Sequence, residues 1–213
     1  MFIERLEKAY RPGKPIFTED ILLLFPEFTK AYVFRLLKKA ENNNELVRFS
    51  RGVYCLPKHT FFGRSSISSS MVANDKYIGD GNNVIGLYSG LSLLNQFAIS
   101  TQVPNVVEIV TNNEATRKRQ VEIGGMKFII RKSRFEITKD NHSYYTILQL
   151  FLELGINPRL NDFSKQRIKE YISSNNMDQK RLIKYAMLFP ARVAKNLLGS
   201  GVLYGTIPEQ RTL

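Results

Sequence analysis

Residues 29–43 have the sequence TKAYVFRLLKKAENN, on which the predicted fold of the N-terminal part depends. Four of its apolar residues recur at intervals of three and four, the spacing of one helical face: Val33, Leu36, Leu37 and Ala40. Thr29 can cap the first turn, because its hydroxyl accepts a hydrogen bond from a backbone amide that the helix leaves free. Arg35 and Lys38 lie on the opposite side. The stretch therefore predicts an amphipathic helix over 30–43 with a basic outer face.

Shorter elements flank this helix on both sides. Residues 2–10 favour a short helix, and Thr18 can cap a second one that Pro26 closes. After the long helix, residues 46–57 predict a β-hairpin, with Gly52 at the turn position that needs a permissive backbone. Short helix, second helix, longer helix and hairpin is the order of a winged helix-turn-helix.

A winged helix-turn-helix that reads DNA lays its longer helix in the major groove and its hairpin beside the backbone. We therefore predict a DNA-binding set on these two elements: Thr29, Lys30, Tyr32, Arg35, Lys38, Lys39, Arg48 and Arg51. The alternative is a winged helix that contacts proteins and whose charges form an ordinary solvated face. The basic excess of the chain favours DNA.

That excess is large and spread along the whole chain. The 213 residues include 31 Lys and Arg against 19 Asp and Glu, a formal charge of +12. Basic residues outnumber acidic ones by 11 to 7 in residues 1–60, by 10 to 7 in 61–140 and by 10 to 5 in 141–213. Neutralising phosphates releases condensed counterions, so such a charge favours a polyanionic partner without identifying it.

Several classes of protein are disfavoured by the composition. No window approaches the roughly 20 apolar residues of a membrane span, and the first residues lack the pattern of a signal peptide. We expect a cytoplasmic protein that does not contact membranes. Cys55 is the only cysteine and is accompanied only by His59 and His142, so we expect no disulfide and no zinc site of Cys and His ligands. We predict no metal and no cofactor, and a metal bound by carboxylates is the alternative.

The chain is predicted to be α+β, with an N-terminal winged helix-turn-helix followed by a mixed α+β domain whose C-terminal part is helical. The predicted divisions are a DNA-binding domain over 1–60, a connector over 61–83 and a second domain over 84–213. In the second domain, Gly124 and Gly125 predict a tight hairpin turn. Residues 142–154 are apolar nearly all round and predict a buried central helix. A later helix over 178–189 is expected to face inward with Leu182, Ile183, Ala186 and Met187.

A catalytic interpretation finds little support in the residues. Glu136, Lys139 and Glu108 suggest the carboxylate and lysine site of a nuclease. However, Glu136 and Lys139 are an odd number of residues apart, which would place them on opposite faces of a strand. Ser89 has a glycine on one side only and does not form a nucleophile elbow. We therefore expect that the chain is not an enzyme.

A series of short motifs carries a resemblance to a known family. The motifs are Arg51-Gly52-Val53-Tyr54, YSGLSLLN at 88–95, TQVP at 101–104, EIVTN at 108–112 and the Gly124-Gly125 hairpin. In this order they resemble the AbiEi-like antitoxins of type IV toxin-antitoxin and abortive-infection systems. The resemblance covers roughly residues 1–150 and is clearest over 84–125.

The resemblance implies a function for each domain. The winged helix would bind operator DNA and repress the chain's own operon through inverted repeats, where a dimer can occupy two half-sites. The second domain would counteract a nucleotidyltransferase-like toxin encoded beside it. The alternative is a protein-interaction module that binds the toxin directly and contacts DNA only incidentally.

The densest positive region of the chain lies in the second domain. It comprises Arg117, Lys118, Arg119, Arg131, Lys132 and Arg134. These side chains are candidates for an additional nucleic-acid contact, either with DNA beyond the winged helix or with toxin-associated RNA. The alternative is that they contact neither.

Overall fold

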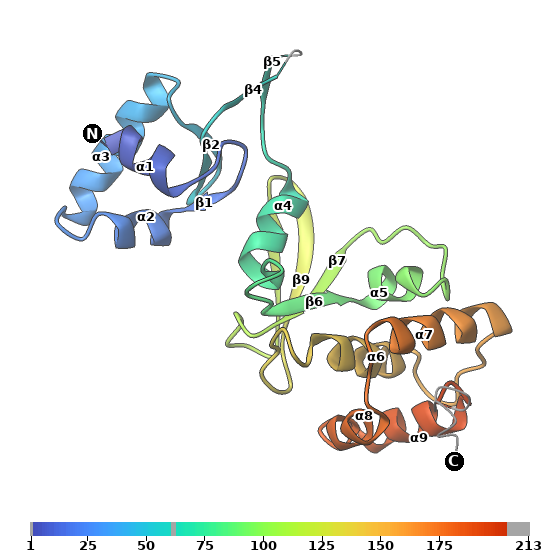
Figure 1. Cartoon of the computed structure of the whole chain (residues 1–213). Coiled ribbons are helices and arrows are strands. Elements are labelled where there is room, and N and C mark those ends of the chain that lie inside the picture. Colours follow the sequence, from blue (N-terminus) through green and yellow to red (C-terminus); the bar gives the residue numbers. More distant parts are fainter. Residues whose placement is uncertain (1, 61–62, 204–213) are drawn as a thin grey trace, which may run out of the picture. The chain divides into compact units, whose positions relative to one another are not determined.

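The structure is a computed structural model that describes residues 2–60 and 63–203 (Figure 1). Residues 61–62 of the predicted connector and 204–213 of the predicted second domain lie outside the described residues. The chain is mixed α+β. It divides into two compact units, the first made of Met1–Lys76 with Glu122–Met126 and the second of Tyr77–Val121 with Lys127–Leu213.

The first unit packs helices on a small sheet. Its leading elements are α1 (Phe2–Ala9), β1 (Ile16–Phe17), α2 (Thr18–Leu24), α3 (Lys30–Asn42), β2 (Val47–Ser50) and β3 (Val53–Cys55). The strands form an antiparallel sheet in the order β1-β3-β2, in which Phe17 is paired with Val53 and Arg48 with Tyr54. The core of the unit includes Leu6, Ile16, Ile21, Val33, Leu37 and Leu46.

Helix α3 confirms the predicted amphipathic helix, although it ends at Asn42. Val33, Leu37 and Ala40 are buried. The hydroxyl of Thr29 caps the first turn by accepting a hydrogen bond of 3.3 Å from the backbone amide of Tyr32. The hairpin that follows is also confirmed, because β2 and β3 flank a turn in which Gly52 has a φ of 78°.

The predicted cap of α2 is wrong. Phe17, not Thr18, occupies the cap position, and no side chain caps the helix. The reason is that β1 stays paired with β3 as far as Phe17, so the helix can begin only at Thr18. The Thr18 hydroxyl oxygen is buried and has no hydrogen-bond partner within the described residues.

The rest of the first unit contains a short hairpin and a helix. The hairpin is β4 (Lys58–Thr60) with β5 (Gly63–Ser65), and the helix is α4 (Ser69–Ala73), which continues as a π-helix over Asn74–Ile78. The hydroxyl of Ser68 caps α4 by accepting from the backbone amide of Met71 at 3.2 Å. The sequence did not predict the β4–β5 hairpin.

The second unit contains a mixed sheet. It is built from β6 (Gly86–Ser89), β7 (Val107–Thr111), β8 (Lys118–Ile123) and β9 (Met126–Lys132), with α5 (Gly90–Gln96) between the first two. The strand order is β6-β7-β9-β8, in which β7 is antiparallel to β6 and parallel to β9. Gly124 and Gly125 have φ values of 54° and 82°, which confirms the predicted turn. The turn itself, with the ends of β8 and β9 over 122–126, belongs to the first unit.

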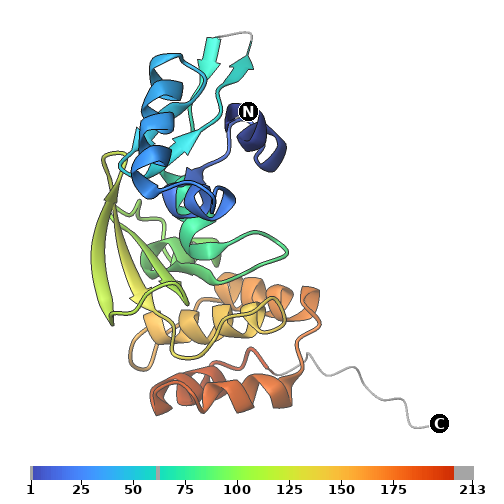
Figure 2. The same cartoon turned by 90° about the vertical axis from the view of Figure 1, so that its left-hand side faces the viewer.

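Four helices complete the second unit: α6 (His142–Glu153), α7 (Asp162–Ser174), α8 (Gln179–Ala186) and α9 (Ala191–Gly199). Helix α6 contacts β6 on one side and α8 and α9 on the other (Figure 2). Its residues 144–151 are all buried, which confirms the predicted central helix. The described helices are too short or too polar to span a bilayer.

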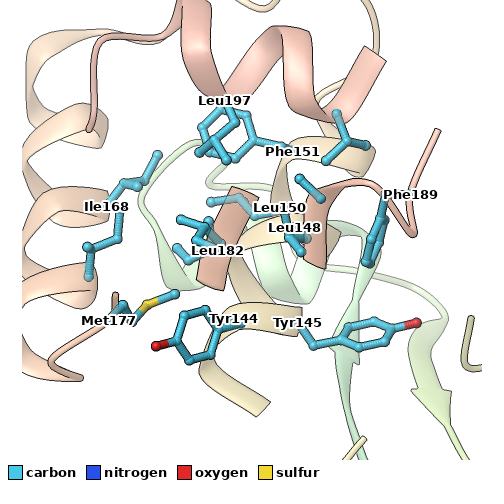
Figure 3. Close-up of a cluster of buried hydrophobic side chains, with 14 of the residues drawn as sticks. Tyr144, Tyr145, Leu148, Leu150, Phe151, Ile168, Met177, Leu182, Phe189 and Leu197 are labelled. Carbon is cyan, nitrogen blue, oxygen red and sulfur yellow. The ribbon is translucent and has the colours of Figure 1, made fainter. Parts of the chain in front are cut away.

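Two neighbouring tyrosines of α6 point to opposite edges of the buried cluster (Figure 3). The hydroxyl of Tyr144 accepts a hydrogen bond of 2.9 Å from the backbone amide of Asp178. The hydroxyl of Tyr145 accepts one of the same length from the backbone amide of Arg134. Burial raises the pKa of Tyr145. The two hydroxyls thus tie α6 to the loop after β9 and to the start of α8.

Helix α8 differs from its predicted orientation. Leu182 and Ala186 are buried as expected, but Ile183 is 42% exposed and Met187 is 80% exposed. The helix ends at Ala186, so Met187 does not continue the helical stripe.

Candidate nucleic-acid interface

Helix α3 carries five of the eight residues predicted to bind DNA, and four of these five are cations. Lys30, Arg35, Lys38 and Lys39 are exposed, because the buried stripe of the same helix turns them towards solvent. Thr29 has a structural role as the cap of the helix. These four cations therefore form a basic surface along one element.

Tyr32 positions one of these cations. The Arg35 guanidinium carbon lies 5.2 Å from the centre of the Tyr32 ring, a cation–π contact. The edge of Phe28 supports that ring at a centroid distance of 5.0 Å, and Phe28 in turn stacks on Phe25. Arg35 is thus held against a row of aromatic rings.

The cations of the hairpin meet one cation of α3 at a shared hollow of about 400 Å³. Its lining consists of Thr18, Phe34, Lys38, Glu41, Arg48, Arg51, Gly52 and Tyr54. Lys38 forms a salt bridge of 3.2 Å with Glu41, whereas Arg48 and Arg51 form none within the described chain. The hollow therefore brings together Lys38, Arg48 and Arg51, while Lys30, Arg35 and Lys39 are exposed on the same helix but do not line it.

The basic residues of the second unit line another hollow, of about 590 Å³. Its lining consists of Val110, Arg117, Arg131, Lys132, Ser133, Arg134, Tyr145, Gln149, Leu152, Glu153 and Arg192. Four of the six predicted cations lie here. Arg192, on α9, was missed because nothing in its local sequence links it to the hairpin.

The other two predicted cations do not line this hollow. Lys118 is exposed on β8. Arg119 donates to the carboxylate of Glu114, with its Nε at 2.9 Å and a second nitrogen at 2.8 Å. The Glu114 side chain is only 3% exposed. Burial alone would raise the pKa of Glu114, but hydrogen bonds from Thr116 and Arg119 lower it overall.

A polar network lies on the inner side of the larger hollow. The buried hydroxyl of Ser89 donates to Oε1 of Glu153 at 2.7 Å. Gln149 donates from Nε2 to the same carboxylate oxygen at 2.6 Å and to the Ser89 hydroxyl at 3.2 Å. Arg131 is bound to Glu108 by contacts of 2.9 and 2.7 Å. The sequence could not predict this network, because its members come from separate elements.

The residues considered as catalytic candidates, Glu136, Lys139 and Ser89, have other surroundings than the sequence suggested. Glu136 and Lys139 lie in the loop between β9 and α6, so the argument from strand spacing does not apply to them. Ser89 is fully buried and its hydroxyl is bound to Glu153. Among the described residues, no group of three or more His, Cys, Asp or Glu side chains is placed to hold a metal ion.

These features define a protein with a basic helix-and-hairpin surface in one unit and a basic hollow in the other. The chain belongs to a family of unknown function, DUF6088, whose sequence pattern matches residues 3–182. No match was found among curated proteins. The family description names no activity.

Proposed function

We propose that the chain is a DNA-binding autorepressor and antitoxin, and that residues 1–60 form a winged helix-turn-helix. One observation carries the proposal for DNA. Lys38 of α3 and Arg48 and Arg51 of the β2–β3 hairpin line the same hollow. A recognition helix and a wing must present their cations on a common face if one is to enter the groove while the other follows the backbone.

The topology of the first unit supports the same proposal. Its elements follow the order α1-β1-α2-α3-β2-β3, and the strands close a three-stranded antiparallel sheet. In this arrangement α3 is the longer helix and β2–β3 is the wing. The buried side of α3 faces the core, and Lys30, Arg35, Lys38 and Lys39 of the same helix are exposed to solvent.

A pair of variants tests the assignment of α3. Arg35→Ala combined with Lys39→Ala removes two exposed cations from the basic face, and the expected loss of operator affinity at physiological salt is about tenfold or more. Lys8→Ala with Arg11→Ala is the matched control, because it removes two exposed charges from the α1 region. Equal affinities for the two double variants would show that α3 is not the recognition helix.

The antitoxin part of the proposal rests on the resemblance to AbiEi-like proteins. The motifs over 88–95 and 108–112 fall on β6, α5 and β7 of the second unit. The proposed partner is a nucleotidyltransferase-like toxin, and the proposed location is the cytoplasm, where a dimer would bind operator DNA.

Co-expression of the full chain should restore growth to cells that express the neighbouring toxin gene. No restoration would contradict the antitoxin role.

One observation favours the second candidate, a module that binds the toxin directly. Four apolar side chains of the C-terminal helices and their connecting loop are exposed: Ile183 at 42%, Met187 at 80%, Leu188 at 53% and Leu198 at 51%. Exposed apolar groups of this kind occur at protein interfaces. A stable complex with the toxin that Met187→Glu and Leu188→Glu abolish, together with no operator binding, would favour this candidate.

A further inference from the structure

We infer that the hollow of the second unit binds a nucleoside phosphate, with the phosphates on its cations and the sugar hydroxyls on Glu153. The binding groups are Arg117, Lys132, Arg134, Arg192 and Glu153. The site lies entirely within the second unit and is independent of the DNA-binding proposal for residues 1–60.

The charges around the hollow call for a multiply charged anion. Among the described residues, five cations line it, and the carboxylate of Glu153 is the only anionic side chain in the lining. Arg131 is neutralised by Glu108. Within the described part of the chain, Arg117, Lys132, Arg134 and Arg192 form no salt bridge. Like charges gathered at one hollow repel one another, so an anion with several charges is the ligand that offsets them.

The hollow is larger than a single phosphate ion requires. Its volume of about 590 Å³ lies within the range of roughly 300–1,000 Å³ that is usual for small-molecule sites. Leu152 is half-buried and adds apolar surface to the lining, whereas Val110 and Tyr145, which also line the hollow, are 3% and 0% exposed. A nucleoside phosphate has a polyanionic end that matches the cations of the lining and a flat base that can pack against Leu152.

The carboxylate of Glu153 determines how the ligand is oriented in the hollow. Ser89 and Gln149 both donate to its Oε1, which holds the carboxylate in place. A carboxylate accepts hydrogen bonds from sugar hydroxyls, as acidic side chains do at the ribose of bound dinucleotides. The same charge repels phosphates. The ligand is therefore oriented with its sugar at Glu153 and its phosphates at the arginines.

Two cations of the hollow, Arg134 and Arg131, are held in position before a ligand arrives. The Tyr145 hydroxyl accepts from the backbone amide of Arg134, and the Arg134 guanidinium lies 5.5 Å from the centre of the Phe189 ring. The salt bridge to Glu108 fixes Arg131. Such preorganisation lowers the entropic cost of ordering these side chains when a ligand binds.

The test measures binding of fluorescent ATP to the full chain by anisotropy, with a 5′-phosphorylated RNA oligonucleotide and duplex DNA as further probes. Arg117→Ala with Arg192→Ala should weaken binding at least about tenfold. The control, Arg159→Ala with Arg167→Ala, removes two exposed arginines of the same unit outside the lining and should leave binding unchanged. The two double variants should bind operator DNA with the same affinity. A loss of ATP binding without a loss of operator binding would distinguish this proposal from the one for residues 1–60.

The probes also identify the source of the ligand. Binding of ATP alone would indicate a free nucleotide, and binding of the phosphorylated RNA alone would indicate the end of a strand. Glu153→Gln should reduce the preference for ATP over inorganic tripolyphosphate. The inference is overturned if neither ATP nor the RNA binds, if duplex DNA binds as tightly as both, or if the control variant loses as much affinity as Arg117→Ala with Arg192→Ala.

Discussion

The backbone amide of Thr18 donates a hydrogen bond of 2.9 Å to the carbonyl oxygen of Gly52, which ties the start of α2 to the turn of the β2–β3 hairpin. Phe17 and Val53, their neighbours, are paired partners of β1 and β3. Arg51 directly precedes the tied glycine. The position of this predicted wing cation therefore depends on a contact made by the backbone of α2.

Replacement of Gly52 should destabilise the first unit. Its φ of 78° lies in the left-handed region, where a side chain costs about 1–2 kcal/mol. An added Cβ would lie 3.6 Å from the Thr18 hydroxyl, so the cost comes from backbone strain and not from a clash. Urea unfolding should show a loss of about 1 kcal/mol for Gly52→Ala. Gly81→Ala is the control, because an added Cβ there has nothing within 4 Å; equal stability of both variants would refute the prediction.

Two threonines near the predicted recognition helix should respond oppositely to the same substitution. Thr29→Val removes the cap of α3 and should cost about 1 kcal/mol. Thr18→Val removes a buried hydroxyl that has no partner in the described residues, so it should be neutral or stabilising. Chemical denaturation of both variants checks this. A large loss for Thr18→Val would show that its hydroxyl is bound.

His142 should make the stability of the second unit depend on pH. Burial lowers its pKa below the usual value of 6.5. Below about pH 6.5 the unfolded chain therefore takes up a proton that the folded chain does not, and stability falls as the pH drops. Thermal unfolding between about pH 7 and pH 5 should show a smaller decrease for His142→Gln than for the unsubstituted chain. Parallel curves for the two proteins would contradict this assignment.

Alanine substitutions of Arg119 and Arg117 should have different effects: the first should lower the stability of the protein, and the second should weaken ATP binding. Arg119→Ala leaves the buried carboxylate of Glu114 without its cation, so the expected loss of stability is about 1–3 kcal/mol. Arg117 is exposed at the larger hollow and forms no salt bridge in the described chain, so Arg117→Ala should leave stability unchanged and weaken ATP binding. Denaturation and anisotropy on both variants measure the two effects. Similar behaviour of the two variants in both assays would be the contrary result.

The elements that the sequence predicted correctly are those whose signals are local. Helix α3 follows from the spacing of Val33, Leu37 and Ala40, and the β8–β9 turn follows from Gly124 and Gly125. Helix α6 follows from a run of apolar residues that leaves no polar face. In each case a few neighbouring residues carry the information.

The features that the sequence missed depend on distant partners. The sequence predicts Thr18 as the N-terminal cap of α2, but the pairing of β1 with β3 determines where this helix begins. Arg192 joins the larger hollow only because α9 packs on α6. The contact of Ser89 with Glu153 spans 64 positions of sequence. Such contacts leave no local pattern in the sequence, so two of the five binding groups of the candidate site in the second unit, Arg192 and Glu153, were not predicted.

If residues 1–60 read operator DNA, the full chain should discriminate between the DNA upstream of its own gene and a scrambled duplex of equal length. Anisotropy with both duplexes at several salt concentrations measures this difference. The upstream DNA should bind about a thousandfold more tightly at physiological salt. The salt dependence of its affinity should report several phosphate contacts. Equal, strongly salt-sensitive affinity for both duplexes would contradict this prediction and leave only non-specific attraction of a basic protein to DNA.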